Sequence, residues 1–326
     1  MNRRKSRTPT VASLSIPKTY DPKVDGITQS LFKRFLRCRA EFVYALNLWR
    51  LDKGGATTGF GSITHEMLDK LYSNFAKRGK LPTPRALDGW LDKYCDEHRD
   101  EMLGIPAQTI ERYKAIIHVL LVEYMRFYRE DFTGKTWLGC EEVFDEIHKP
   151  TGVRRRGKID GRFELRGGMW LLETKTMSRI EEDKLTNRLN LDLQNLFYID
   201  AGEQKFGRKI RGVLYNVIRN PAFRKVDEPL NELVARLRTE VRRNPEHYFI
   251  RYECVYNDRD KSQYAHDLNL QLADLVDFCA GDLRVYRNHS ACDHKYPCDF
   301  MHACASGKLA GYKQTDSLFP ELECAA

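Results

Sequence analysis

Residues 157–176 read GKIDGRFELRGGMWLLETKT. Two segments that alternate between apolar and polar residues flank a glycine pair, and this pattern predicts a β-hairpin. If the loop holds an even number of residues, as Arg166-Gly167 does, Asp160 and Glu173 lie opposite each other on one face. Lys175 shares that face, because side chains repeat every two residues along a strand. The stretch therefore predicts two carboxylates and an ammonium group on one patch of a sheet.

This grouping favours a metal site. Carboxylate oxygens are the ligands that hard cations such as Mg²⁺ require, and an adjacent lysine can hold or polarise a water beside the cation. The same residues also suit an ordinary surface strand, since charged side chains are common on the wet face of a sheet. The spacing by itself leaves both interpretations open.

Asp160 together with Glu173-Thr174-Lys175 resembles the core signature of the PD-(D/E)XK nuclease superfamily. Two further motifs resemble its RecB-like branch. They are a Gly-x-x-x-His element from Gly61 to His65, and a Gln-x-x-x-Tyr motif formed by Gln194 and Tyr198. The order and joint occurrence of these motifs are more specific than any one of them.

The resemblance implies a metal site in which His65, Asp160, Glu173 and the Thr174 backbone carbonyl bind Mg²⁺ or Mn²⁺. Imidazole and carboxylate are both normal ligands for such cations. The chemistry implied is phosphodiester hydrolysis that leaves a 5′-phosphate and a 3′-hydroxyl.

The remaining catalytic residues follow from the same resemblance. Lys175 is expected to orient the attacking water and to balance charge in the transition state. Gln194 and Tyr198 are four residues apart and share a helix face, and they are expected to position the lysine and to contact DNA. A plain core role for the Tyr198 ring stays open.

Four cysteines extend the resemblance to an iron–sulfur variant of the branch, which includes the CRISPR-associated and AddB-type exonucleases. These cysteines are Cys38, Cys292, Cys298 and Cys304. Five residues separate the successive C-terminal cysteines, whereas the variant usually has one shorter interval. Three histidines lie among them, namely His289, His294 and His302. A structural [4Fe–4S] cluster is therefore expected, with a structural Zn²⁺ site as the alternative.

The composition suits an anionic partner and argues against several other classes of protein. The chain has 326 residues and a net charge of +8. No run of eighteen apolar residues occurs, so no membrane span is expected. Nine cysteines without a signal peptide argue against a disulfide framework. Basic clusters at 154–156, 205–211 and 242–243 suit a polyanion, although each also suits a solvated face.

Apolar periodicity predicts a mostly helical first part and then a change to strand patterns. Helices are expected over 30–50, 185–201, 229–243 and 262–278, and strands over 138–148, 209–218 and 247–256. We therefore expect an α/β fold with a restriction-endonuclease-like mixed central sheet flanked by helices, a helical N-terminal region and a C-terminal cysteine cluster.

The expected segments follow this change of pattern. They are a basic flexible tail at 1–26, a helical region at 27–135 that carries Cys38 and His65, a nuclease core at 136–280, a cysteine-cluster segment at 281–306, and a tail at 307–326.

These features predict a divalent-metal-dependent DNA exonuclease that acts at single-stranded ends in recombination, repair or phage DNA processing. One alternative is a nuclease subunit of a helicase–nuclease complex. A helicase or recombinase partner would then supply the motor, because Gly134-Lys135-Thr136 resembles a phosphate-binding loop but Arg129 stands where that motif needs Gly. The other alternative is a non-catalytic DNA-binding protein on a nuclease scaffold. The expected location is the cytoplasm, or the host cytoplasm if the chain is phage-encoded.

Overall fold

The structure is a computed structural model that describes residues 15–52, 59–221, 228–281, 284–292 and 298–323. The chain forms two compact units, each assembled from separate stretches of sequence. The cysteine unit contains Met1–Asp52, Val143–Lys158 and Asp258–Ala326, and the hairpin unit contains Lys53–Glu142 and Ile159–Asn257. Cys38 and His65, which the sequence groups in one helical region, fall in different units.

The predicted hairpin is confirmed. Strands β4 (Arg154–Leu165) and β5 (Gly168–Met177) pair antiparallel, with Leu165 opposite Gly168. The two-residue loop has positive φ angles at both positions, 52° at Arg166 and 71° at Gly167. Such a turn matches the twist of the flanking strands. The even loop length sets the register that places position 160 opposite position 173.

The hairpin belongs to a six-stranded mixed sheet of order β1-β4-β5-β6-β7, in which β3 also pairs with β4. The other strands are β1 (Ile27–Thr28), β3 (Thr136–Ile147), β6 (Ile210–Arg219) and β7 (Phe249–Val255). β5 and β6 are parallel, and the crossover between them carries α6 (Glu182–Leu189) and α7 (Leu193–Phe206). β1 also pairs parallel with β4, whereas the pairs β4–β5 and β6–β7 are antiparallel. The expected fold class, a mixed sheet flanked by helices, is confirmed.

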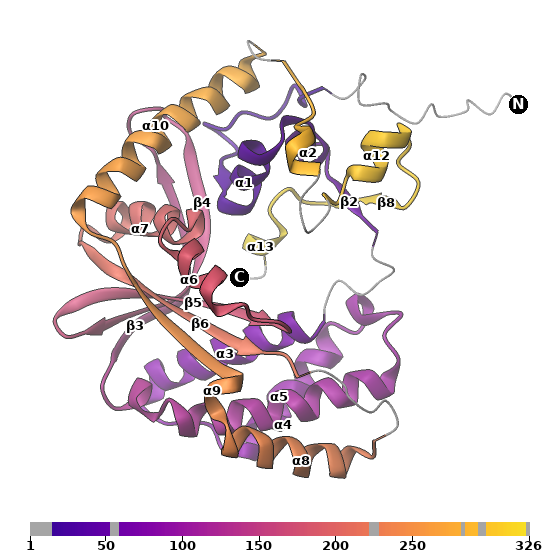
Figure 1. The fold of residues 1–326 in the computed structure, drawn as a ribbon, viewed down its shortest axis with the longest axis vertical. Coiled ribbons are helices and arrows are strands. Elements are labelled where there is room, and N and C mark those ends of the chain that lie inside the picture. The colour runs from indigo at the N-terminus through magenta and orange to yellow at the C-terminus, as the bar shows by residue number, and fades with distance from the viewer. Residues whose placement is uncertain (1–14, 53–58, 222–227, 282–283, 293–297, 324–326) are drawn as a thin grey trace, which may run out of the picture. The chain divides into compact units, whose positions relative to one another are not determined.

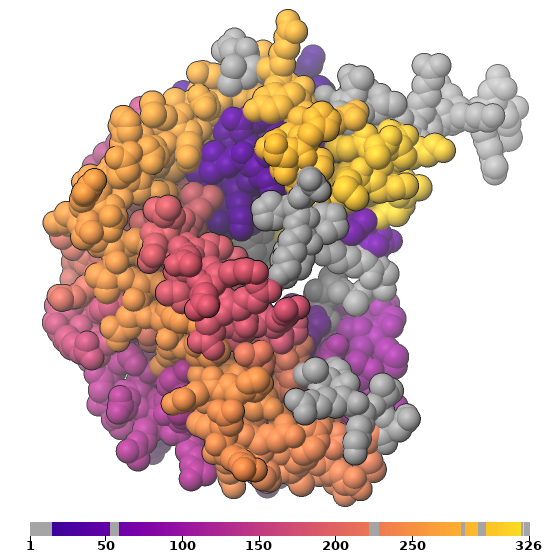
Figure 2. All heavy atoms as spheres, in the orientation of Figure 1, coloured from indigo at the N-terminus to yellow at the C-terminus, as the bar shows by residue number. Residues whose placement is uncertain are grey.

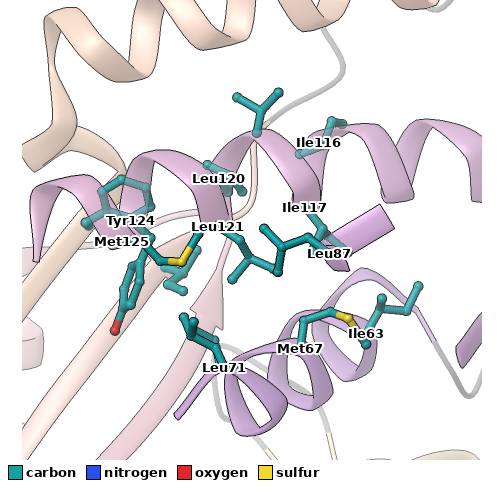
Figure 3. Packing of buried hydrophobic residues seen from close by; sticks show 14 of the residues in the cluster. Ile63, Met67, Leu71, Leu87, Ile116, Ile117, Leu120, Leu121, Tyr124 and Met125 are labelled. Atoms are coloured by element: carbon teal, nitrogen blue, oxygen red, sulfur yellow. The ribbon is translucent and has the colours of Figure 1, made fainter. Parts of the chain in front are cut away.

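Helices cover one face of the sheet in the hairpin unit (Figure 1). They are α3 (Phe60–Arg78), α4 (Pro84–Glu97), α5 (Ala107–Phe127) and α8 (Leu230–Arg243). Their apolar side chains pack with Trp170 and Leu172 of β5 in one core. Figure 3 shows α3 contributing Met67 and Leu71 to this core, beneath Leu121 of α5. The core therefore fixes which face of β5 turns inward.

Helix α8 shows the amphipathic pattern that this packing requires. Its buried residues are Leu233, Leu237 and Val241, which recur at helical spacing. Figure 2 shows α8, in orange, at the surface of the hairpin unit. The short helix α9 (Pro245–Tyr248) then leads into β7.

The single helix expected over 30–50 is wrong. The chain forms α1 (Gln29–Arg37) and α2 (Arg39–Leu46), separated by Cys38 in an extended conformation. Residues far along the chain form hydrogen bonds with the backbone groups that this break leaves unpaired. Asn288 Nδ2 donates to the Arg37 carbonyl at 2.8 Å, and the Ala40 N–H donates to the Tyr286 carbonyl at 3.1 Å. The break thus places a thiol beside residues 286–288.

The helix expected over 185–201 is also interrupted. Asp192 accepts hydrogen bonds from the backbone N–H groups of Gln194 and Asn195, both at 3.0 Å. This cap begins α7, so α6 and α7 are separate helices. The other expected helices and strands are present at nearly the predicted bounds.

The cysteine unit has a smaller core and a two-stranded sheet. β2 (Trp49–Leu51) pairs antiparallel with β8 (Tyr312–Gln314). Its remaining helices are α10 (Asp258–Ala280), α11 (His289–Cys292), α12 (Met301–Ser306) and α13 (Pro320–Glu323). Phe278 of α10 packs against Phe35 and Phe42, with ring centroids 5.6 and 6.0 Å away. In the part of the chain that the structure describes, no helix is both long and apolar enough to cross a bilayer.

Gly212 permits the close approach of β6 to its neighbours. A Cβ atom at this position would overlap the Cys254 carbonyl oxygen and the Trp170 ring. We expect Gly212→Ala to lower the free energy of unfolding by about 1–3 kcal/mol, because overpacking against backbone is hard to relieve. Gly89→Ala is the matched control. It lies in helix α4 with nothing within 4 Å of the added Cβ, and should leave stability unchanged or raise it by about 0.5–1 kcal/mol. Denaturant titration of both variants checks this, and equal effects would contradict it.

Candidate active site

Asp160 lies where the backbone pairing of the hairpin stops. The ladder between β4 and β5 runs from Leu165–Gly168 to Gly161–Leu172. One position further on, the Asp160 carboxylate accepts the backbone N–H of Thr174 at 2.7 Å. A side chain thus replaces a backbone partner at this point, and the Asp160 carboxylate is held beside the Glu173-Thr174 peptide.

Glu173 is a buried carboxyl group, with 3% of its surface exposed. Burial raises its pKa, the neighbouring Asp160 adds to the rise, and Lys175 opposes it, so that the pKa is about 8. Among the residues that the structure describes, its Oε2 atom has no hydrogen-bond partner. An unsatisfied buried carboxylate oxygen beside a second carboxylate is costly. A cation at this point would relieve the repulsion between the Asp160 and Glu173 carboxylates and would give Glu173 Oε2 a partner.

Lys175 completes the group that the hairpin brings together. Its ammonium forms an ion pair with Glu173 and donates to Gln194 Oε1 at 3.0 Å. Burial by itself lowers the lysine pKa, but the charges of Glu173 and Asp160 outweigh burial and the pKa is raised. The lysine is therefore cationic and is held from two sides.

Helix α7 meets the site with its first turn. Gln194 is the second residue of the helix, and Tyr198 lies one turn further on, half-buried, with its ring 6.4 Å from that of Phe197. The structure thus brings Gln194 to Lys175 and places Tyr198 on the same side of the helix.

Sequence reasoning missed two neighbours of the site. Tyr215 lies opposite Glu173 in the parallel β5–β6 register, and Asp192 caps α7. Burial raises the pKa of Tyr215 to about 12, with Asp192 and Glu173 adding to the rise. The cap at Asp192 was detectable as an Asp just before an apolar helical segment. The pairing of Tyr215 has no local signal, because it depends on the tertiary crossover.

His65 lies in the second turn of α3. The same helix passes close to the end of β5, since a Cβ atom on Gly61 would lie 3.0 Å from Thr176 Oγ1. Gly61 therefore has a packing role that explains the Gly of the Gly-x-x-x-His element. However, within the described ranges no three His, Cys, Asp or Glu side chains form a group that could hold a metal. The structure thus brings Asp160 to Glu173, and the part of His65 as a further ligand stays a prediction.

Cys38, Cys292, Cys298 and Cys304 are free thiols in the cysteine unit. The Asn288 N–H donates to Cys38 Sγ at 3.3 Å, and Cys292 Sγ donates to the Asn288 carbonyl at 3.6 Å. Burial raises the pKa of Cys304, and the charges of Cys38 and Cys292 add to the rise. Burial likewise raises the pKa of Cys298 to about 11, again with a contribution from Cys38. The four thiols are thus electrostatic neighbours.

Their chemistry suits a thiolate-bound cluster. The four sulfurs do not form a metal-holding group within the described residues. His289 begins α11 and His302 lies in α12, whereas His294 lies outside the described residues.

Each of the three basic clusters has at least one arginine in an ion pair. Arg154 and Arg156 both contact Asp145, and Arg155 is fully buried. Arg208 pairs with Glu164 at 2.7 Å, and Arg242 with Glu123 at 2.8 Å. The cluster at 154–156 therefore offers less free charge to a polyanion than its sequence suggests.

The raised pKa of Glu173 predicts a pH-dependent affinity for Mn²⁺. The folded carboxyl keeps its proton up to about pH 8, well above its ordinary pKa of 4.5. A cation must displace that proton, so the affinity should rise by up to about tenfold per pH unit and level off above pH 8. The raised pKa also affects stability. The free energy of unfolding of the metal-free protein should fall as the pH rises from 4.5 towards 8, because the Glu173 carboxyl ionises in the unfolded chain but not in the folded protein over that range. Calorimetric Mn²⁺ titration at several pH values measures the affinity.

Glu173→Gln is the control for this titration, since the amide cannot ionise. Its residual Mn²⁺ affinity should not change over the pH range in which the parent protein changes. A wild-type affinity that is independent of pH, or an equally steep dependence in the variant, would contradict the assignment.

The chain matches a known protein family over most of its length. The family model for the PD-(D/E)XK nuclease superfamily matches residues 27–305. No curated protein matches the chain. One similar solved structure is a protein from Eubacterium rectale described as a candidate exonuclease, with 13% identity and a TM-score of 0.48 over 90% of this chain and 91% of that one. The family match includes the β4–β5 hairpin, α7 and the four clustered cysteines. The chain therefore belongs to the PD-(D/E)XK nuclease superfamily.

Proposed function

We propose that this nuclease is a divalent-metal-dependent DNA exonuclease that hydrolyses phosphodiester bonds at single-stranded ends. One observation carries the proposal. The buried Glu173 carboxylate has an oxygen without a hydrogen-bond partner among the described residues, and it lies beside Asp160 and a lysine that Gln194 holds. Structural ion pairs normally satisfy their buried oxygens, so this arrangement suits a cation and a reacting group.

Asp160 and Glu173 are the residues that would hold Mg²⁺ or Mn²⁺, with the Thr174 carbonyl and His65 as further ligands. The closeness of α3 to Thr176 supports the part given to His65. When bound, the cation would polarise the phosphodiester and lower the pKa of a water. Asp160 also orients its own site, because its bond to the Thr174 N–H fixes the peptide that follows Glu173.

Lys175 would orient the attacking water and neutralise charge on the phosphate as it develops. Its ammonium is partly buried and cationic, so the charge acts where the dielectric is lower than in bulk water and is worth more there. The bond to Gln194 limits the directions in which the ammonium can point. Tyr198, on the same face of α7, would contact the nucleic acid.

The thiols of Cys38, Cys292, Cys298 and Cys304 would hold a structural [4Fe–4S] cluster. Their mutual electrostatic influence and the N–H bond to Cys38 Sγ support this proposal. Thiolates that accept backbone N–H groups are typical of iron–sulfur sites. The cluster would link the α1–α2 break to the C-terminal helices and would take no part in hydrolysis.

Lys175→Ala should lower turnover by about a hundredfold or more, because a charge aimed at the transition state is lost. Glu173→Gln should lower it at least as much. Lys184→Ala, which removes an exposed lysine of α6 that pairs with Glu181, is the matched control and should leave turnover unchanged. The measurement uses end-labelled single-stranded DNA with Mn²⁺, Mg²⁺ or chelator.

A circular single strand distinguishes the outcomes of this assay. Metal-dependent loss of linear but not circular DNA supports an exonuclease, and cleavage of both substrates would make the protein an endonuclease. Binding without cleavage would favour the non-catalytic alternative. Wild-type turnover in Lys175→Ala would remove the lysine from the mechanism.

Metal analysis tests the cluster separately. Protein purified without oxygen should contain about four iron atoms and equivalent sulfide per chain. Cys292→Ser should lose them, whereas Cys95→Ser, in α4 of the hairpin unit, should keep them. Stoichiometric zinc without iron would contradict the proposal.

A further inference from the structure

A row of buried polar side chains lies on the sheet face opposite Glu173 and Lys175. Thr174, Asn216 and Arg251 occupy paired positions on β5, β6 and β7. Thr174 is 3% exposed and Asn216 is fully buried. This face otherwise packs into the apolar core beneath α3 and α5. Polar groups in such a place are stable only if they are hydrogen-bonded.

The three side chains form a chain of hydrogen bonds across the strands. Asn216 Nδ2 donates to Thr174 Oγ1 at 3.4 Å, and Arg251 Nε donates to Asn216 Oδ1 at 2.9 Å. Arg251 can only donate, so the amide of Asn216 must turn its oxygen to Arg251 and its nitrogen to Thr174. The arginine thereby sets the orientation of the asparagine.

Arg251 is itself fixed from the helical layer. Its two terminal nitrogens donate to Asp131 at 2.8 and 2.6 Å, and one of them also donates to Tyr124 at 2.6 Å. Its guanidinium lies 3.4 Å above the centre of the Tyr128 ring. Asp131 is 1% exposed and also contacts Lys135. With two bonds to one carboxylate and a ring beneath it, the guanidinium has one available orientation.

The series of hydrogen bonds from Arg251 through Asn216 ends at Thr174, within the proposed site. Thr174 separates Glu173 from Lys175, and its backbone N–H is already bound by Asp160 at 2.7 Å. The residue is therefore held through its N–H on one side and through its hydroxyl on the other. These two bonds leave its carbonyl, the group expected to ligate the cation, with little freedom to rotate.

We propose that Asn216 and Arg251 are positioning residues, which hold Thr174 so that its carbonyl and the Glu173 carboxylate face the same cation. This inference rests on the proposed function and adds two residues from the opposite face of the sheet. A purely structural role would stabilise the fold without affecting the cation. Partners of this kind usually change metal affinity by about 10–100-fold when they are removed.

Thr174→Val is the main test, because it removes the hydroxyl and keeps the shape and the backbone carbonyl. We expect the Mn²⁺ dissociation constant, measured by calorimetry, to rise about tenfold or more. Asn216→Ala should act in the same direction. Thr174→Ser, which keeps the hydroxyl, should bind Mn²⁺ within about twofold of the parent protein. The melting temperature of each metal-free variant shows that it folds.

Tyr72→Phe separates positioning from stability. It removes a hydroxyl that donates to Asp131 at 2.7 Å and accepts from Arg251 at 3.1 Å, while Arg251 keeps both bonds to Asp131 and its bond to Tyr124. This variant should melt at a lower temperature and still bind Mn²⁺ within about twofold of the parent protein.

Mn²⁺ affinity unchanged in both Thr174→Val and Asn216→Ala would overturn the proposal, as would an equal loss of affinity in Tyr72→Phe. If the parent protein binds no Mn²⁺ and cleaves no DNA, the proposed function fails and this inference fails with it. If the parent protein binds and cleaves while the Thr174 and Asn216 variants match it, only the positioning role fails.

Discussion

The hydrogen bond from the Thr174 N–H to the Asp160 carboxylate is the constraint on which the site depends. It replaces the next rung of the hairpin ladder, so the acid is held by the same geometry that holds the strands. Without it, Asp160 would be free to rotate away from Glu173, and the repulsion between the two carboxylates would favour that movement. The turn at Arg166-Gly167 sets the strand register, which aligns Asp160 with Glu173. The hydrogen bond then keeps the Asp160 carboxylate beside Glu173.

The two faces of β5 have different tasks. One face carries Glu173 and Lys175 towards α7, where Gln194 binds the lysine. The other face carries Thr174 towards Asn216 and the apolar core. Adjacent residues of a strand point to opposite sides. A single strand can therefore carry the site residues on one face and the residues that pack against the core on the other. The core packing of α3, α5 and α8 therefore supports β5 from the face opposite Glu173 and Lys175.

The sequence predicted what local chemistry specifies. The alternating segments and the glycine turn both depend on neighbouring residues, and they are present as expected. The breaks at Cys38 and before Asp192 were missed. At Cys38 the backbone partners lie about 250 residues away, at Tyr286 and Asn288, so no local pattern indicates them.

The site was predictable to the same extent. Asp160, Glu173 and Lys175 converge because one hairpin carries them. The part of His65 depends on how α3 packs against the sheet, so the hairpin alone does not specify it and it stays a prediction. Tyr215 and Asn216 become neighbours of the site only through the parallel pairing of β6 with β5, which the sequence of either strand does not specify. Anomalous diffraction from crystals grown with Mn²⁺ shows whether the two acids share a cation. One manganese peak should lie about 2 Å from oxygens of both Asp160 and Glu173, whereas manganese found only elsewhere would mean that they hold no common ion.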